Sequence, residues 1–164
     1  MTESPNSDVD SAVFRELCGR FATGVVIVTA TDAAGAPMGM TANSFTSVSL
    51  MPPMISINVD RAAEFHAIIA EAGQFTINIL SASQEALSRR FATSPGSDRF
   101  SGVGFRRTDR GRIHLTGAIA AIECEKAHQL DVGDHTIVVG RVVGGEVTDG
   151  PPLLYYRGGY RTLG

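Results

Sequence analysis

Cysteine is scarce in this sequence, which contains only Cys18 and Cys124 and no paired-cysteine motif. A disulfide framework is therefore not expected, and a reducing cytoplasm fits this cysteine usage. An excess of positive charge is also missing: the formal net charge is −3, so no nucleic-acid partner is expected. No apolar run is long enough to span a bilayer, and the amino-terminal MTESPNSDVDS lacks the basic and apolar regions of a signal peptide. We expect a cytoplasmic protein without a membrane partner.

The short motifs that mark many enzyme classes are absent as well. No serine lies in a G-x-S-x-G elbow, and neither G-x-G-x-x-G nor G-x-x-x-x-G-K-[ST] occurs. Cys124 and His128 are four residues apart, but no second pair of ligands completes a metal site. We expect Cys124 to be a small core residue on a strand, and we predict no metal site.

The spacing of apolar residues and turn signals predicts a mainly β fold. Helices are expected over 11–21, 60–73 and 81–91. Strands are expected over 23–31, from 39 onward, and over 54–59, 74–80, 113–125, 135–147 and 153–156, with a long surface loop over 93–111. Because strands and helices do not alternate regularly, an antiparallel barrel with a few peripheral helices fits better than a parallel sheet. We predict a disordered lead-in at 1–10 and a single domain over 11–164.

The segment GMTANSFTSVSLMPPM, residues 39–54, combines small polar residues with apolar ones. Successive residues of an extended strand face opposite sides, yet neither side of this segment is uniformly apolar. Burial in a core therefore does not account for it. A polar heteroaromatic ligand would account for it, because amides, hydroxyls and main-chain N–H groups suit carbonyls, ring nitrogens and a polyol chain. The alternative is a solvated edge strand rich in serine and threonine.

Two further segments contain candidate ligand-binding residues. In VGDHTIVVGRV, residues 132–142, a Gly-Asp turn places His135 at the start of a strand, where imidazole can donate a hydrogen bond or stack on a ring. Alternatively, Asp134 and His135 only close the turn. LLYYRGGYR, residues 153–161, contains every tyrosine and two arginines, which suit a planar or phosphorylated ligand. Its alternative is a core or interface strand whose arginines reach water.

Together these segments make the chain similar to the short-chain flavin reductases, the reductase components of two-component flavin-dependent monooxygenases. The resemblance runs from Phe14 to the carboxyl terminus. It is carried by FATGVVIVTA at 21–30, GMTANSFTSVSLMPP at 39–53, RRFA at 89–92, RF at 99–100, GDH at 133–135 and LLYYRGGY at 153–160. It implies the FMN-binding split barrel, an antiparallel Greek-key barrel that usually forms a homodimer.

The resemblance also implies which residues bind FMN or FAD and the reduced nicotinamide nucleotide, NADH or NADPH. The implied flavin-binding residues are Thr41, Asn43, Ser44, Ser47, Val48, Ser49, Arg61, Phe91, Ala92 and Arg99. His135 would be the catalytic-site residue that orients the nicotinamide or the flavin edge, and Tyr156 and Arg157 would border the nicotinamide pocket.

The sequence departs from the family pattern after the third predicted strand. Family members often have serine or threonine there to meet the flavin phosphate, whereas this chain has Ala62, Ala63 and Phe65. Arg61 keeps the positive charge, and main-chain N–H groups at the start of the following helix can also attract an anion. The preference between FMN and FAD is therefore left open.

The function implied is that of an NAD(P)H-dependent flavin reductase, which passes hydride from nicotinamide C4 to flavin N5 and supplies reduced flavin to a separate monooxygenase. No strong general base is expected, because the redox chemistry belongs to the two ring systems. Two alternatives stay open. One is a non-catalytic flavin-binding or sensor module, and the other is a split-barrel oxidoreductase whose flavin is tightly bound.

Overall fold

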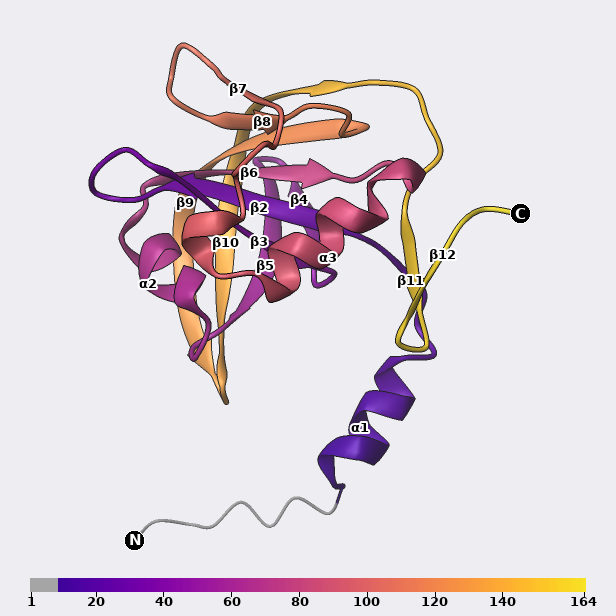
Figure 1. Ribbon diagram of the computed structural model, residues 1–164. Coiled ribbons are helices and arrows are strands. Elements are labelled where there is room, and N and C mark those ends of the chain that lie inside the picture. The colour runs from indigo at the N-terminus through magenta and orange to yellow at the C-terminus, as the bar shows by residue number, and fades with distance from the viewer. Residues whose placement is uncertain (1–8) are drawn as a thin grey trace, which may run out of the picture.

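A computed structural model describes residues 9–164 of the chain (Figure 1). Most of the predicted lead-in, residues 1–8, lies outside the described residues. The first helix, α1 (Ser11–Cys18), begins where expected, because Oδ1 of Asp10 accepts hydrogen bonds from the main-chain N–H groups of Ala12 and Val13 at 2.8 and 2.9 Å. None of the helices described is long and apolar enough to cross a membrane.

The body of the molecule is one large antiparallel sheet with two small sheets beside it. The large sheet has the strand order β3-β2-β6-β9-β10-β5-β4. Its strands are β2 (Val26–Thr31), β3 (Pro37–Ala42), β4 (Thr46–Leu50), β5 (Pro53–Asp60), β6 (Gln74–Ile79), β9 (Ala120–Val132) and β10 (His135–Val147). The small sheets are β1 (Thr23–Gly24) with β11 (Leu154–Tyr156) and β12 (Gly159–Arg161), and β7 (Phe105–Arg107) with β8 (Ile113–Leu115).

Strands β3 and β4 follow each other in the sequence but form opposite edges of the large sheet. Only residues 43–45 connect them. A chain of that length spans at most about 14 Å, so the two edges must lie close together and the sheet must curl. The result is a barrel that is open along one side. The predicted mainly β, antiparallel split barrel with a few peripheral helices is confirmed.

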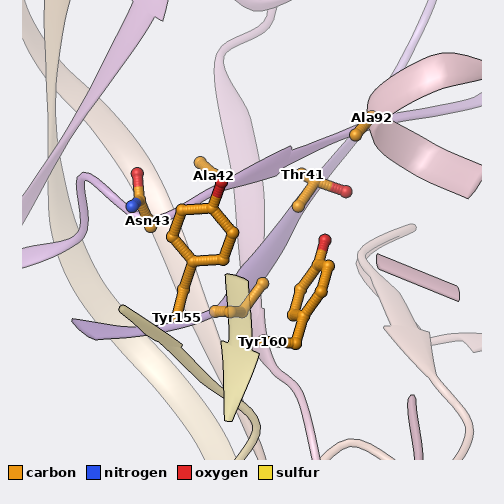
Figure 2. Close-up of a pocket in the computed structure, with 7 residues that line it drawn as sticks. Thr41, Ala42, Asn43, Ala92, Tyr155 and Tyr160 are labelled. Carbon is orange, nitrogen blue, oxygen red and sulfur yellow. The ribbon is translucent and has the colours of Figure 1, made fainter. Parts of the chain in front are cut away.

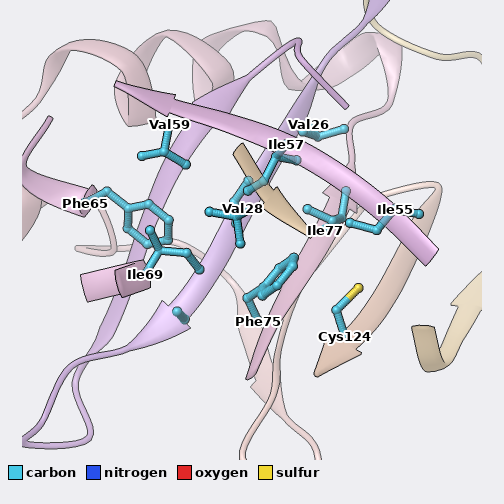
Figure 3. Packing of buried hydrophobic residues seen from close by; sticks show 12 residues of the cluster. Val26, Val28, Ile55, Ile57, Val59, Phe65, Ile69, Phe75, Ile77 and Cys124 are labelled. Atoms are coloured by element: carbon cyan, nitrogen blue, oxygen red, sulfur yellow. The ribbon is translucent and has the colours of Figure 1, made fainter. Parts of the chain in front are cut away.

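Two hydrophobic cores lie on the two faces of β2. Alternate residues Val26 and Val28 point into the barrel, where they pack with residues of β5, β6, β9 and α2 (Glu64–Glu71) (Figure 3). Their neighbours Val25 and Ile27 point the other way, into a second core under α3 (Glu85–Thr93). This double burial explains why residues 25–28 are all apolar. Cys124 is fully buried in the barrel core, as predicted, and burial raises the pKa of its thiol to about 12.

The helix expected from residue 60 is shorter than predicted. Oδ1 of Asp60 accepts a hydrogen bond from the Ala62 main-chain N–H at 2.8 Å, which stabilises a turn before α2 begins at Glu64. The helix ends at Glu71, before Gly73. The predicted Ser81–Gln84 capping box is present; it opens a short 3-10 helix, η1 (Ala82–Gln84), that leads into α3.

The long loop predicted over 93–111 is more ordered than expected. It contains a second 3-10 turn, η2 (Gly96–Asp98), and strand β7, which pairs with β8. Phe100 connects α3 with β7, since its ring packs edge-to-face against Phe91 of α3 at 5.0 Å and against Phe105 of β7 at 5.3 Å between ring centroids. These aromatic contacts hold the loop against the second core, and the short strand β7 is the part that departs from the predicted surface loop.

Helix α1 extends away from the barrel (Figure 1). Its predicted apolar face is present but uncovered in the single chain: Phe14 is 60% exposed, Leu17 62% and nearby Phe21 80%. A main-chain hydrogen bond from Arg157 N–H to Gly19 O, 3.0 Å long, connects the end of the helix to the β11–β12 hairpin.

Candidate active site

Three pockets meet at Asn43, in the segment that joins β3 to β4. The tyrosine pocket, about 200 Å³, is lined by Val25, Thr41, Ala42, Asn43, Ala92, Tyr155 and Tyr160 (Figure 2). The histidine pocket, about 650 Å³, is lined by residues of α1, residues 40–44 and the ends of β5 and β10, including Asp60 and His135. The helix pocket, about 300 Å³, lies between α1 and the β11–β12 hairpin.

The tyrosine pocket has two aromatic walls from one hairpin. Tyr155 and Tyr160 are cross-strand partners, and their rings meet edge-to-face with centroids 5.3 Å apart. The Tyr160 hydroxyl lies 2.7 Å from Oγ of Ser88 on α3, and the guanidinium of Arg89 lies 4.7 Å from the centre of the Tyr160 ring. Helix α3 therefore holds this ring from behind, while Tyr155 and Thr41 remain at the pocket (Figure 2).

One side of the histidine pocket, where β5 ends and β10 begins, is lined by carboxylates and an imidazole. His135 is the register partner of Asp60, and its side chain is 44% exposed. Its Nδ1 lies 2.7 Å from Oδ1 of Asp134, and this hydrogen bond lowers the pKa of the Asp134 carboxyl below its ordinary value. Because the carboxylate accepts, Nδ1 carries the proton. The other ring nitrogen, Nε2, is the one available to a ligand in the neutral imidazole.

The predicted flavin-binding segment divides into two parts. Thr41, Asn43 and Ser44 line the pockets. The Thr41 hydroxyl donates to the Ser88 carbonyl at 2.6 Å, and the Ser44 hydroxyl bonds both main-chain groups of Asn58 on β5, at 3.2 and 3.0 Å. The Thr41 hydroxyl therefore fixes the end of β3 to α3, and the Ser44 hydroxyl fixes the β3–β4 connection to β5. The Asn43 side chain is exposed at the junction of all three pockets.

The other part of that segment lies on the edge strand β4. Ser47 and Ser49 flank a bulge at Val48, and none of the three residues lines these pockets. Ala92, by contrast, lies at the end of α3 and lines the tyrosine pocket (Figure 2). Phe91 is fully buried in the second core, where its ring fills the space beside Gly39.

The two predicted arginines bind main-chain carbonyls of the protein. Arg99 donates to the carbonyls of Ser94 and Gly39 at 2.8 and 2.7 Å, which fixes the loop after α3 to β3. Arg61 is exposed and donates to the Gly133 carbonyl at 3.4 Å. At the start of α2, the Glu64 carboxylate accepts the Gly96 N–H at 3.0 Å, so this helix end already has a negative group.

Of the predicted nicotinamide-side residues, the structure brings His135 and Arg157 to different pockets. Arg157 lines the helix pocket and occupies the left-handed region of backbone space with φ 51°. Tyr156 is the last residue of β11 and lines none of the three pockets.

Asn58 and Asp60, which line the histidine pocket, were not predicted from the sequence. Tyr155 and Tyr160 belong to the 153–161 segment that was predicted to suit a planar ligand, although the family resemblance implied neither of them individually. A signal for the tyrosines is present in the sequence. A two-residue Arg-Gly turn at 157–158 pairs Tyr156 with Gly159, and therefore pairs Tyr155 with Tyr160 on one face.

The lining residues fit planar heteroaromatic ligands. Pockets of several hundred cubic ångströms with aromatic and apolar walls and a few polar groups are typical of small-molecule sites. Here Tyr155 and Tyr160 supply the aromatic walls, and Asn43 and His135 supply polar groups on adjoining sides. Among the residues that the structure describes, no group of three or more His, Cys, Asp or Glu side chains could hold a metal ion.

Comparison with known proteins finds flavin reductases among the relatives of this chain. The chain is 41% identical over 159 residues to a flavin reductase of Pseudomonas putida, covering 96% of this chain and 93% of that protein. It is 39% identical over 158 residues to the reductase component of a 4-nitrophenol 4-monooxygenase/4-nitrocatechol 2-monooxygenase of Rhodococcus opacus, covering 96% and 84%. A probable flavin reductase of Rhizobium meliloti (strain 1021) is 42% identical over 153 residues, but the chain spans only 49% of its length.

Comparison with solved structures supports the fold. The Streptomyces globisporus C-1027 NADH:FAD oxidoreductase SgcE6, solved in complex with NAD and FAD fragments, superposes with a TM-score of 0.89. It is 35% identical to this chain, and the match covers 94% of this chain and 93% of that one. The family model for the flavin reductase like domain matches residues 18–164. The chain therefore belongs to the flavin reductase like family.

Proposed function

We propose that this protein is an NAD(P)H:flavin oxidoreductase that reduces FMN or FAD with NADH or NADPH. The observation that carries the proposal is the meeting of an aromatic-walled pocket and a larger His135 pocket at Asn43. Two planar ring systems bound there would lie next to each other. Relatives named flavin reductase, and a similar structure named NADH:FAD oxidoreductase, support this assignment. Hydride transfer from nicotinamide C4 to flavin N5 is the chemistry that the bound nucleotides supply.

The protein's own contribution is positional. Residues 41–43 and Tyr155 would hold the flavin ring, and the Asn43 amide would bind polar atoms at its edge. His135, with Nδ1 held by Asp134, would present Nε2 to the nicotinamide or the flavin edge. Holding two rings in reactive geometry requires no strong acid or base, and it can supply a large part of the rate enhancement.

For Arg61, Ser47, Val48 and Ser49, we propose contacts at the phosphate-bearing end of the flavin. Arg61 is exposed and can meet an anion, whereas Ala62, Ala63 and Phe65 bring no hydroxyl groups. Ser47, Val48 and Ser49 lie on the edge strand that continues from the pocket. Arg99 and Phe91 would support the ligand-facing residues from behind, through Gly39 on β3.

We also propose that the reduced flavin leaves for a separate monooxygenase. The support is the relative from Rhodococcus opacus, which is named as the reductase component of such a system. A cytoplasmic location belongs to the same proposal, and it is supported by the free thiols of Cys18 and Cys124.

A homodimer is the oligomeric state that we propose. The uncovered apolar face of α1, made by Val13, Phe14 and Leu17, together with nearby Phe21, is unfavourable in water, and a second copy of the chain can bury it. Sedimentation velocity of the wild-type protein should show a dimer, and Leu17→Glu should shift it to a monomer. The control is Leu163→Glu, a similarly exposed leucine near the carboxyl terminus. A monomeric wild-type protein would contradict this part of the proposal.

The activity is tested by following nicotinamide absorbance with NADH or NADPH, with and without added FMN, FAD or riboflavin. The proposed reductase oxidises the nicotinamide at a rate that depends on added flavin. A non-catalytic flavin-binding module would retain flavin but oxidise no nicotinamide. An oxidoreductase with a tightly bound flavin would turn over without added flavin. Absence of both flavin retention and nicotinamide oxidation would refute the proposal.

A further inference from the structure

The turn that joins β9 to β10 carries His135 and is tied to the neighbouring strand end. The Arg61 main-chain N–H donates to the Asp134 carbonyl at 3.0 Å, and the Arg61 guanidinium donates to the Gly133 carbonyl at 3.4 Å. Both contacts hold the main chain of the turn. Neither of them fixes the direction of the side chains at the start of β10.

A hydrogen-bonded chain centred on the buried Thr136 fixes that direction from the opposite face of β10. The Thr136 hydroxyl donates to Oδ1 of Asp131 at 2.6 Å, and the same oxygen lies 2.9 Å from Nε2 of His66. A carboxylate can only accept, so the hydroxyl hydrogen is committed to Asp131. The Thr136 oxygen therefore accepts from Nε2–H of His66, which assigns the tautomer of this imidazole.

Both ends of this chain are connected to structure that can resist movement. His66 lies on α2, whose neighbouring residues Phe65 and Ile69 are buried in the barrel core. Asp131 lies on β9, directly across from Thr136 in the strand pairing. Thr136 itself is only 3% exposed. The hydroxyl is thus held between a packed helix and the partner strand.

Consecutive residues of a strand face opposite sides, so fixing Thr136 on one face also fixes the Cα–Cβ direction of His135 on the other. His135 lines the histidine pocket. We propose that His66, acting through Thr136 and Asp131, is a positioning residue that holds the His135 imidazole toward its ligand. This inference rests on the proposed function only for the identity of that ligand, the reduced nicotinamide nucleotide.

The test compares two substitutions at residue 136. Thr136→Val keeps the shape but removes both hydrogen bonds, whereas Thr136→Ser keeps the hydroxyl. We expect Thr136→Val to raise the KM for the nicotinamide nucleotide by about fivefold, with kcat changed by less than about twofold. Thr136→Ser should restore the wild-type KM, and His66→Ala should reproduce the effect of Thr136→Val.

The matched control is Thr76→Val, another fully buried threonine on a strand, whose hydroxyl has no hydrogen-bond partner in the part of the chain described. Thermal unfolding of each variant confirms that it is folded at the assay temperature. An unchanged KM in Thr136→Val would overturn the proposal. An equal rise in Thr76→Val would also overturn it, because the effect would then come from general loosening of the barrel.

A second readout does not need activity. The side-chain NMR signals of His135, assigned with His135→Ala among the four histidines of the chain, should move in Thr136→Val and stay in place in Thr76→Val. If the wild-type protein oxidises no nicotinamide with any flavin, the proposed function fails, and these signals alone decide the positioning role. Signals of His135 that do not move in Thr136→Val would then refute it.

Discussion

Tyr155 and Tyr160 face each other across the β11–β12 hairpin, with ring centroids 5.3 Å apart and ring planes inclined by 70°. The Tyr160 hydroxyl and ring are held by Ser88 and Arg89 of α3, so the pair forms a fixed wall of the tyrosine pocket. A rigid aromatic wall costs little conformational entropy when a planar ligand binds.

Replacing the Tyr155 ring should weaken flavin binding. We expect Tyr155→Leu to raise the flavin KM by about fivefold, because an aromatic contact contributes roughly 1 kcal/mol beyond simple burial. Tyr155→Phe keeps the ring and should leave the KM near the wild-type value. Initial rates at varied FMN and FAD measure the effect. Equal values of KM for the leucine and phenylalanine variants would show that the ring is not part of the flavin site.

His135→Ala should raise the KM for the nicotinamide nucleotide more than it lowers kcat. The expected increase is about tenfold, the effect of losing an orienting hydrogen bond of roughly 1.4 kcal/mol. His128→Ala is the matched control, because His128 is an exposed histidine of β9 that lines none of the three pockets. Steady-state kinetics at saturating flavin separate the two parameters. A collapse of kcat at unchanged KM would contradict an orienting role.

Glu146 of β10 is paired with His114 of β8 and Arg106 of β7, and these pairs should make the free energy of unfolding fall in acid. The hydrogen bond from His114, at 2.9 Å, and the Arg106 guanidinium hold the pKa of Glu146 below its ordinary value. A lowered folded-state pKa means that this contribution is fully present above the ordinary pKa of glutamate and is lost as the pH falls through the folded value. Urea unfolding at about pH 7 and about pH 3 measures the loss.

The comparison for that measurement is Glu146→Gln. This variant should be less stable than the wild-type protein near neutral pH, and the difference between the two should shrink as the pH falls. A constant difference across the acidic range would show that the Glu146 carboxylate has no role in the pH dependence.

Gly39→Ala should destabilise the fold through steric overlap. A Cβ at position 39 would lie 2.8 Å from the Phe91 ring and 3.1 Å from the Val28 carbonyl oxygen. Phe91 is fully buried and has little room to move, so we expect a loss of about 1–3 kcal/mol in the free energy of unfolding. Gly24→Ala is the control, since a Cβ at position 24 would have no neighbouring atom within 4 Å. Chemical denaturation of both variants tests the difference.

Periodic segments of the sequence predicted the fold well. The strand predicted over 135–147 has those bounds in the structure, and the Ser81–Gln84 capping box opens the helical segment that was expected there. These elements are determined by local patterns of apolar residues and caps. The late start of α2 was not predicted, because it depends on the Asp60 carboxylate accepting a hydrogen bond from the Ala62 main-chain N–H.

The candidate site was harder to predict, because its shape depends on a break in the strand pattern. Strict alternation would place Thr41, Asn43 and Ser47 on one side of a single strand. Instead, the strand ends at Ala42, and the chain crosses to the other edge of the sheet before β4 begins. No local signal in the sequence shows that crossing, so the separation of Ser47 from the pockets could not be predicted.

The order of the strands in the large sheet and the position of the three pockets both depend on one short segment, residues 43–45. Residues 43–45 carry the polypeptide across the slit of the barrel, and Asn43 lies where the three pockets meet. An insertion that lengthened the connection at residues 43–45 would let the open side of the barrel widen, and it would displace the Asn43 side-chain amide at the same time. The length of residues 43–45 and the shape of the pockets around Asn43 are therefore linked.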